Sequence, residues 1–233
     1  MYPYFYGFDP TYMLIIIGAV LSLGASAVVN STFRKYSRVR SLSGMTGAQA
    51  AQKILNAAGI YDVSVQHISG NLTDHYDPGA KVLRLSDSVY GETSVAAIGV
   101  AAHECGHAIQ HQHSYVPLRL RTAIFPVASF GSKIAWPLIL LGIILSMSQT
   151  LIYAGIFLFS FAVLFQLVTL PVEFNASRRA VKILDDSGIL YGDEVGITKK
   201  VLGAAALTYV AGAAAAILQL LRLLILFGGR NRD

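Results

Sequence analysis

Residues 94–107, with the sequence SVAAIGVAAHECGH, decide the fold, because they read as an apolar helix that ends in a zinc-helix motif. Residues four apart share one face of an α-helix, so His103 and His107 can present both imidazoles to one metal ion. Glu104 lies about 100° around the helix from His103, close enough to take a proton from a zinc-bound water. The spacing therefore predicts a catalytic zinc site rather than a pair of structural histidines.

The composition around this motif is that of a membrane protein. Hydrophobic residues make up 54% of the 233 residues, charged residues only 13%, and the mean hydropathy is +0.55. A soluble domain has about 25% charged residues, and a helix that crosses a bilayer needs about 20 mostly apolar residues. Arg222 lies near the end of the last apolar segment, which either spans the bilayer or lies on its surface as an amphipathic helix. The predicted spans are 11–29, 125–147, 151–170 and, with that alternative, 201–227.

Basic side chains predict the orientation of these spans, because Lys and Arg are enriched in cytoplasmic loops. An N-terminus outside the cell places four basic clusters on the cytoplasmic side, against only Arg230 and Arg232 in the C-terminal tail. Topology and contact with the lipid bilayer account for these basic residues, so we read no nucleic-acid partner from the net charge of +5. The clusters are Arg34, Lys35, Arg38 and Arg40; Arg119 and Arg121; Arg178, Arg179 and Lys182; and Lys199 and Lys200.

Residues 34–124 are predicted to fold as a cytoplasmic catalytic unit that contains the motif helix. Thr46 with Gln49 has the pattern of a capping box, and Gly59 is suited to end that helix. Ser94 is suited to cap the motif helix, which should reach at least Gln110. Turn residues separate three predicted strands, at 63–68, 72–76 and 81–85.

Glu173 is the favoured third zinc ligand. Catalytic zinc usually has three protein ligands and one open position. Two spans joined by the link 148–150 separate Glu173 from His107, and such a hairpin returns the chain to the side that it left. Pro171 is suited to begin a helix, over 171–200, with Glu173 in its first turn near the membrane surface.

His113 and His111 are the alternatives for the third ligand. His113 follows His103 by ten residues, which is the spacing of the extended metzincin motif. That motif needs a glycine three residues after its second histidine, where this chain has Gln110, a residue that favours a continuing helix. A straight helix cannot wrap three turns around one ion, which argues against His111. We therefore expect both histidines at the exposed end of the helix.

Four stretches of the chain carry a resemblance to a known family. They are LTDHYDP at 72–78, KVLRLS at 81–86, the stretch from 94 to 107, and PVEFNASRRA at 171–180. Together they resemble the YugP-type family of zinc metallopeptidases of bacterial membranes, and the resemblance covers nearly the whole chain. It implies a multi-pass protein of the bacterial plasma membrane that binds one Zn²⁺ and acts on peptides or proteins, with membrane proteins as candidate substrates.

A more distant similarity is to the membrane gluzincins of the HtpX heat-shock and CAAX prenyl protease group. They too place a glutamate ligand after a hydrophobic hairpin, which implies a metal set of His103, His107 and Glu173. That group usually has an aspartate four residues after its glutamate, supporting a zinc histidine. Ser177 stands there in this chain, so Asn175 is the candidate substitute.

The sequence also offers candidates for substrate binding and for stabilising the oxyanion. In related metallopeptidases an edge strand just before the active helix pairs with extended substrate. The resemblance places Val82, Leu83, Arg84 and Leu85 in that role. Oxyanion candidates that the residues alone do not separate are His75, Tyr76, Arg178 and Arg179.

The predicted fold is a mainly α-helical integral membrane protein, with three or four transmembrane helices and a small α+β zincin-like unit that contains a short β-sheet. The predicted function is zinc-dependent peptide hydrolysis at the cytoplasmic membrane surface, with Glu104 as the base. A site-2-type intramembrane protease, with Asp185 and Asp186 as acidic candidates, is one alternative. A non-catalytic membrane scaffold with a structural zinc is the other, although such a site has no use for a base at Glu104.

Overall fold

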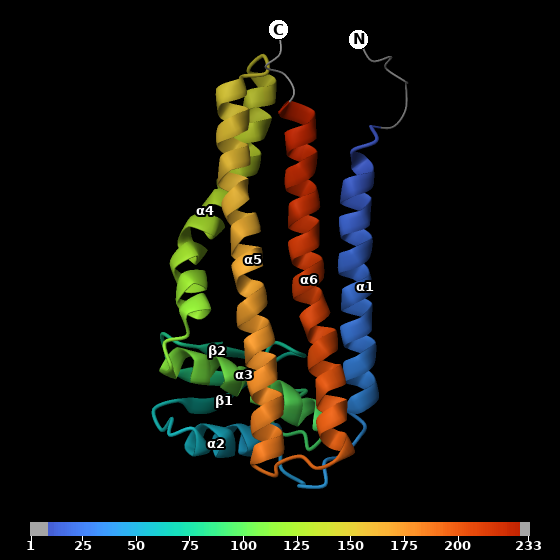
Figure 1. The fold of residues 1–233 in the computed structure, drawn as a ribbon, viewed down its shortest axis with the longest axis vertical. Coiled ribbons are helices and arrows are strands. Elements are labelled where there is room, and N and C mark those ends of the chain that lie inside the picture. Colours follow the sequence, from blue (N-terminus) through green and yellow to red (C-terminus); the bar gives the residue numbers. More distant parts are fainter. Residues whose placement is uncertain (1–8, 229–233) are drawn as a thin grey trace. The chain divides into compact units, whose positions relative to one another are not determined.

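The computed structural model describes residues 9–228, and within this range the chain forms six helices and three strands (Figure 1). Contacts divide the chain into two compact units. We call residues 26–119 and 170–208 the sheet-containing unit, and the described parts of 1–25, 120–169 and 209–233 the apolar unit. The elements are α1 (Tyr12–Tyr36), α2 (Gly47–Ala57), β1 (Ser64–Ile68), β2 (His75–Asp77), β3 (Val82–Ser86), α3 (Val95–Gln112), α4 (Val116–Ile144), α5 (Gln149–Asp186) and α6 (Asp193–Phe227).

The apolar unit is built from parts of four helices. Within residues 9–228, α1, α4, α5 and α6 are long and apolar enough to cross a membrane, as predicted. At most 28% of the most apolar stretch of each helix is buried, so most of these apolar side chains face outward, as lipid contact requires. Gly18 lets α1 approach α6 closely, since a Cβ there would lie 3.2 Å from Ala215.

Arg222, the charged residue in the last apolar helix, has partners within the apolar unit. Its guanidinium carbon lies 4.6 Å from the centre of the Tyr12 ring, and Nη2 lies 4.0 Å from Asp9 Oδ2. A cation held by an aromatic face and a carboxylate is less costly in an apolar helix than an isolated one. Arg230 and Arg232, which conflict with the predicted orientation, lie outside the described residues.

Helix α5 differs from the prediction at Pro171. The sequence predicts that a span ends at 170 and that a new helix begins at Pro171, but the structure has one helix of 38 residues with Pro171 inside it. A proline in a helix interior removes one backbone donor. Here Val172, Ala176 and Ala180 are completely buried just beyond it, so tertiary packing holds the helix through the proline. The chain breaks later, between Asp186 and Asp193.

The sheet-containing unit has a three-stranded sheet in the order β1-β3-β2. Strand β3 is parallel to β1 and antiparallel to β2, with Tyr76 opposite Leu83. The prediction that the strand before α3 is an edge strand is therefore wrong, because β3 is paired on both sides. Its side chains explain the central place, since Leu83 and Leu85 are completely buried in the core.

Helices α2 and α3 pack against each other beside this sheet, and both predicted caps are confirmed. Thr46 and Gln49 form a capping box at α2, and the Ser94 hydroxyl accepts a hydrogen bond from the Ala97 N–H at α3. The second strand starts three residues later than predicted. Leu72 has a φ of 55°, and Asp74 accepts hydrogen bonds from Ser86, so residues 72–74 lie outside the strand.

Candidate metal centre

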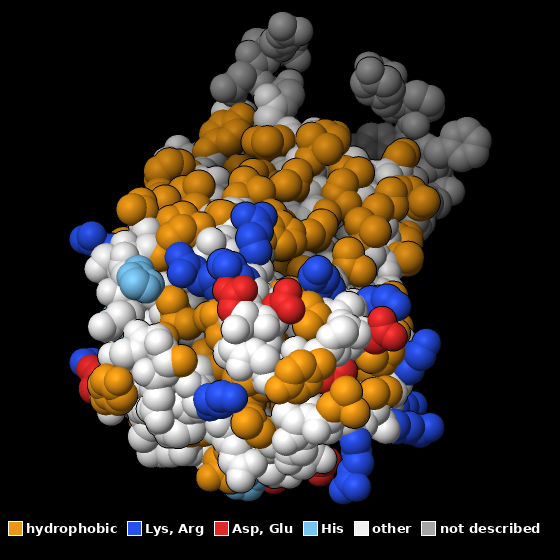
Figure 2. All heavy atoms as spheres, turned by 60° about the horizontal axis from the view of Figure 1, so that its bottom comes forward, with side chains coloured by type: hydrophobic (Ala, Val, Ile, Leu, Met, Phe, Trp, Pro, Cys, Tyr) orange, Lys and Arg blue, Asp and Glu red, His pale blue; other side chains and the backbone are white. Residues whose placement is uncertain are grey.

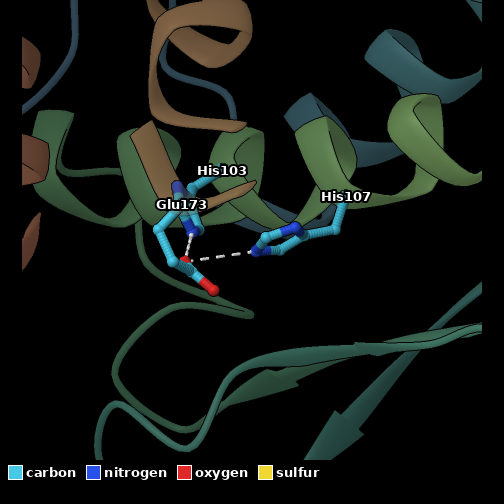
Figure 3. A group of neighbouring side chains, drawn as sticks. All are labelled: His103, His107 and Glu173. Carbon is cyan, nitrogen blue, oxygen red and sulfur yellow. Dashed lines mark hydrogen bonds and ion pairs between the residues drawn. The ribbon is translucent and has the colours of Figure 1, made fainter. Parts of the chain in front are cut away.

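Helices α3 and α5 bring three candidate zinc ligands together within the sheet-containing unit. The imidazoles of His103 and His107 project from successive turns of α3, and the Glu173 carboxylate reaches them from α5 (Figure 3). Glu173 Oε2 lies 3.2 Å from His103 Nε2 and 3.5 Å from His107 Nε2. Within residues 9–228, this is the one group of three or more His, Cys, Asp or Glu residues whose donor atoms lie within 4.8 Å of one another.

The arrangement fits a zinc ion. Ligand atoms at the usual zinc distances of about 2.0–2.1 Å in a tetrahedron lie about 3.3 Å apart, close to the separations seen here. Glu173 is only 3% exposed, and each histidine side chain is 12% exposed. Two imidazoles and one carboxylate leave a fourth position open, which is the pattern of a catalytic rather than a structural zinc site.

Each histidine is held through its other ring nitrogen. His103 Nδ1 lies 3.1 Å from the Ser177 hydroxyl, and His107 Nδ1 lies 3.0 Å from Gln110 Oε1. Ser177 is thus itself the partner of His103, and Asn175 does not substitute for it. Asn175 instead accepts hydrogen bonds from Gln110 and Arg179.

Gln110 is a contributor that the sequence reasoning missed. From the sequence, Gln110 indicates only that the helix continues, yet its side chain is completely buried and contacts His107. Its position three residues after His107 is a usable signal, because residues at i and i+3 are neighbours on a helix.

The crossing of α3 and α5 depends on Gly106. A Cβ at this position would lie 2.7 Å from the Ala176 carbonyl oxygen. The absence of a side chain therefore lets α5 approach the helix face that carries both histidines.

Glu104 lies beside the two histidines in a buried position, 8% exposed. Its Oε2 accepts a hydrogen bond of 3.0 Å from the Tyr76 backbone N–H of β2. Burial lowers the pKa of His107, but contact with Glu173 and the charge of Glu104 raise it by more, so this pKa lies above its ordinary value. The carboxylate of Glu104 therefore acts electrostatically on the ligand set that it adjoins.

Other histidines and the cysteine lie apart from the three ligands. His111 Nδ1 faces the Tyr76 hydroxyl at 2.9 Å, and His113 is the exposed residue that ends α3. The ring nitrogens of His75 face Thr73 and Arg84. The Cys105 thiol packs against the Ala51 carbonyl oxygen, and burial raises its pKa, which disfavours the thiolate that a zinc ligand must supply.

The remaining predicted residues lie on α5 and in the sheet. Arg178 is exposed on α5, while Val82, Leu83 and Leu85 are buried in the centre of the sheet. Arg84 pairs with Asp77 across the two strands β3 and β2. Asp185 and Asp186 are exposed at the end of α5, outside the ligand group, where Asp186 pairs with Lys182.

Comparison with known proteins shows the family to which the chain belongs. Residues 11–228 match the family described as "Putative neutral zinc metallopeptidase". The chain is also 52% identical over 221 residues to a Bacillus subtilis (strain 168) protein named "Putative membrane protease YugP", an alignment that covers 94% of this chain and 98% of that protein. No solved structure matches it. The chain, a membrane protein by its apolar helices, therefore belongs to this family of neutral zinc metallopeptidases.

Proposed function

We propose that the protein is a zinc endopeptidase of the gluzincin type, with its active site on the cytoplasmic side of a bacterial plasma membrane. The observation that carries the proposal is the cluster of His103, His107 and Glu173, with the buried Glu104 carboxylate next to it. A purely structural zinc has no use for a second, non-ligating carboxylate in that place.

Each residue of the cluster has a defined task. His103, His107 and Glu173 would hold one zinc ion, which supplies Lewis acidity and lowers the pKa of a bound water toward neutrality. Glu104 accepts a proton from the attacking water and passes it to the leaving amine. The Tyr76 N–H orients Glu104 by donating to one carboxylate oxygen, which leaves the other oxygen for the proton.

Strand β2 is the edge where an extended substrate can pair. It is the outer strand of the sheet next to α3. Main-chain pairing at an edge gives affinity with little sequence choice, which suits a protease that acts on peptides or on proteins, membrane proteins among them.

The distribution of Lys and Arg supports a location of the ligand cluster on the cytoplasmic side. Apart from Arg121, Lys133 and Arg222, every Lys and Arg of the described residues belongs to the same unit as the three ligands. Figure 2 shows several of these basic side chains on one face, together with acidic ones. Positive residues next to spans remain on the cytoplasmic side, so the ligand cluster should lie there too.

Replacement of Glu104 by Gln tests the mechanism. The variant should keep zinc, because none of the three ligands changes, and should lose at least about 100-fold in kcat, as expected for loss of a general base. The measurement is hydrolysis of a fluorescently quenched unfolded protein by purified protein in detergent, beside zinc content by atomic emission.

The matched control is Glu92→Gln, which removes an exposed carboxylate outside the cluster. It should behave as wild type in both measurements. Undiminished hydrolysis by Glu104→Gln would disprove the proposed base. A wild-type protein that binds zinc but cleaves no substrate would instead favour the scaffold.

A further inference from the structure

Gln110 is a completely buried polar side chain whose amide group links α3 to α5. Its Nε2 donates to the Val172 carbonyl oxygen at 2.8 Å and to Asn175 Oδ1 at 3.0 Å. Its Oε1 lies 3.0 Å from His107 Nδ1. A buried amide is costly unless its donors and acceptors are satisfied, so these three contacts together account for its place in the core.

The orientation of the amide groups follows from the chemistry of their neighbours. Arg179 Nε lies 2.8 Å from Asn175 Oδ1, and a guanidinium has donors only. Asn175 must therefore present its oxygen. Because the same oxygen faces Gln110, Gln110 must present its NH₂ group there. The Val172 carbonyl, which can only accept, imposes the same orientation.

This orientation decides the tautomer of His107. With both amide hydrogens of Gln110 directed at α5, only its oxygen remains for the imidazole. An oxygen acceptor requires a proton on Nδ1, which leaves the lone pair of a neutral ring on Nε2. Nε2 is the nitrogen that faces Glu173.

We propose that Gln110 is a positioning residue, which fixes the Nδ1–H tautomer and the ring direction of His107 for zinc. The orientation of Gln110 is set in turn by Val172 and by the pair Asn175 and Arg179 on α5. The proposal rests on the proposed zinc centre but not on its catalytic mechanism. A metal-ligating histidine often donates to a carboxylate; here a neutral amide takes that place, so His107 is oriented without a further buried charge.

The hydrogen bonds of Gln110 also affect Glu173. Val172 and Asn175 lie on either side of Glu173 in α5. The Gln110 amide that orients His107 therefore also holds the helical turn that carries the third ligand. Loss of the amide should therefore weaken zinc binding through two ligands.

The first measurement needs no variant of Gln110. Histidine labelled with ¹⁵N in the full-length protein, in detergent micelles with zinc added, should show protected Nδ1–H groups for His107 and for His103. Ser177→Ala assigns the His103 group, because it removes the hydroxyl that contacts that nitrogen. A wild-type His107 with its proton on Nε2 in the zinc-free, neutral ring, or without a protected Nδ1–H, overturns the proposal.

The second measurement compares zinc affinity among variants. Gln110→Met keeps an unbranched side chain of similar size and removes all three hydrogen bonds. It should weaken the zinc Kd by about 10–100-fold and lose the protected His107 Nδ1–H. Gln112→Leu alters an exposed glutamine of the same helix, so its zinc affinity should stay near wild type.

The outcomes separate this proposal from the proposed function. Wild-type zinc affinity and an unchanged imidazole spectrum in Gln110→Met overturn the positioning role while the zinc centre stands. A wild-type chain that binds no zinc overturns the proposed function, and the zinc-free spectrum still decides the tautomer. Circular dichroism of the zinc-free variants reports folding, and if Gln110→Met does not fold, the wild-type spectrum decides alone.

Discussion

The Glu173 carboxylate lies where the two imidazole nitrogens converge, and it is the candidate ligand that comes from a different helix. Its replacement by Ala should reduce zinc affinity by more than about 100-fold, a larger loss than removal of a hydrogen-bonded partner of a ligand causes. His113→Ala should keep wild-type zinc content, because His113 is exposed at the end of α3. Atomic emission of the purified proteins measures both, and zinc loss only in His113→Ala would contradict the ligand assignment.

The raised pKa of His107 predicts how zinc affinity depends on pH. Burial lowers its pKa, and Glu173 and Glu104 raise it by more, so the zinc-free protein holds this proton more tightly than an ordinary imidazole. Zinc must displace the proton below this raised pKa and has none to displace above it. Affinity should therefore fall as pH falls through the raised pKa.

Competition with a chromophoric chelator between about pH 8 and about pH 6 measures this fall. In Glu104→Gln, which lacks one of the two carboxylates, the fall should begin at lower pH. An affinity that does not change across the range would disagree with the raised pKa.

The sequence predicts those residues of the candidate metal centre that lie in one short motif. The helical period places His103 and His107 on one face, and the charged neighbour Glu104 follows from the same five residues. The partners Ser177 and Gln110 could not be chosen from the sequence, because their contacts depend on how α3 and α5 cross.

At the level of helices, the crossing of α3 and α5 depends on one missing methyl group. Gly106→Ala would place a Cβ 2.7 Å from the Ala176 carbonyl oxygen, a backbone atom that cannot rotate away. Overpacking of this kind costs about 1–3 kcal/mol, and it should also weaken zinc binding by moving Glu173 away from the histidines.

The control for this prediction is Gly196→Ala in α6, where a Cβ would meet nothing within 4 Å. This change should be neutral or stabilise the helix by up to about 1 kcal/mol. Thermal unfolding with and without zinc measures both variants. Equal midpoints for Gly106→Ala and wild type would show that the two helices have room to separate.

Some helices and strands follow local sequence preferences, whereas in others tertiary packing overrides those preferences. Caps at Thr46 and Ser94 follow from local hydrogen bonds and were predictable. The continuous helix through Pro171 was not, because buried neighbours on α5 compensate for the missing donor. The central position of β3 in the sheet also could not be predicted from the sequence, because strand order depends on pairing between distant segments.

For the whole molecule, the orientation in the membrane can be tested with single cysteines. The native Cys105 is buried, so it should not react with a membrane-impermeant maleimide. Thr150→Cys, at the exposed start of α5, should be labelled in intact cells. Glu92→Cys, in the unit that holds the ligands, should be labelled only after lysis. The reverse pattern would place the ligand cluster outside the cell.

The order of the ligands along the chain has a consequence for biosynthesis. The histidine pair is translated first, and the third ligand emerges only after α4 and most of the apolar part of α5 have been made. A nascent chain that stops before residue 173 lacks the Glu173 carboxylate, and it also lacks Ser177 and Asn175, which contact His103 and Gln110. We therefore expect that the nascent chain cannot assemble the three candidate ligands until α4 and the apolar part of α5 have been made.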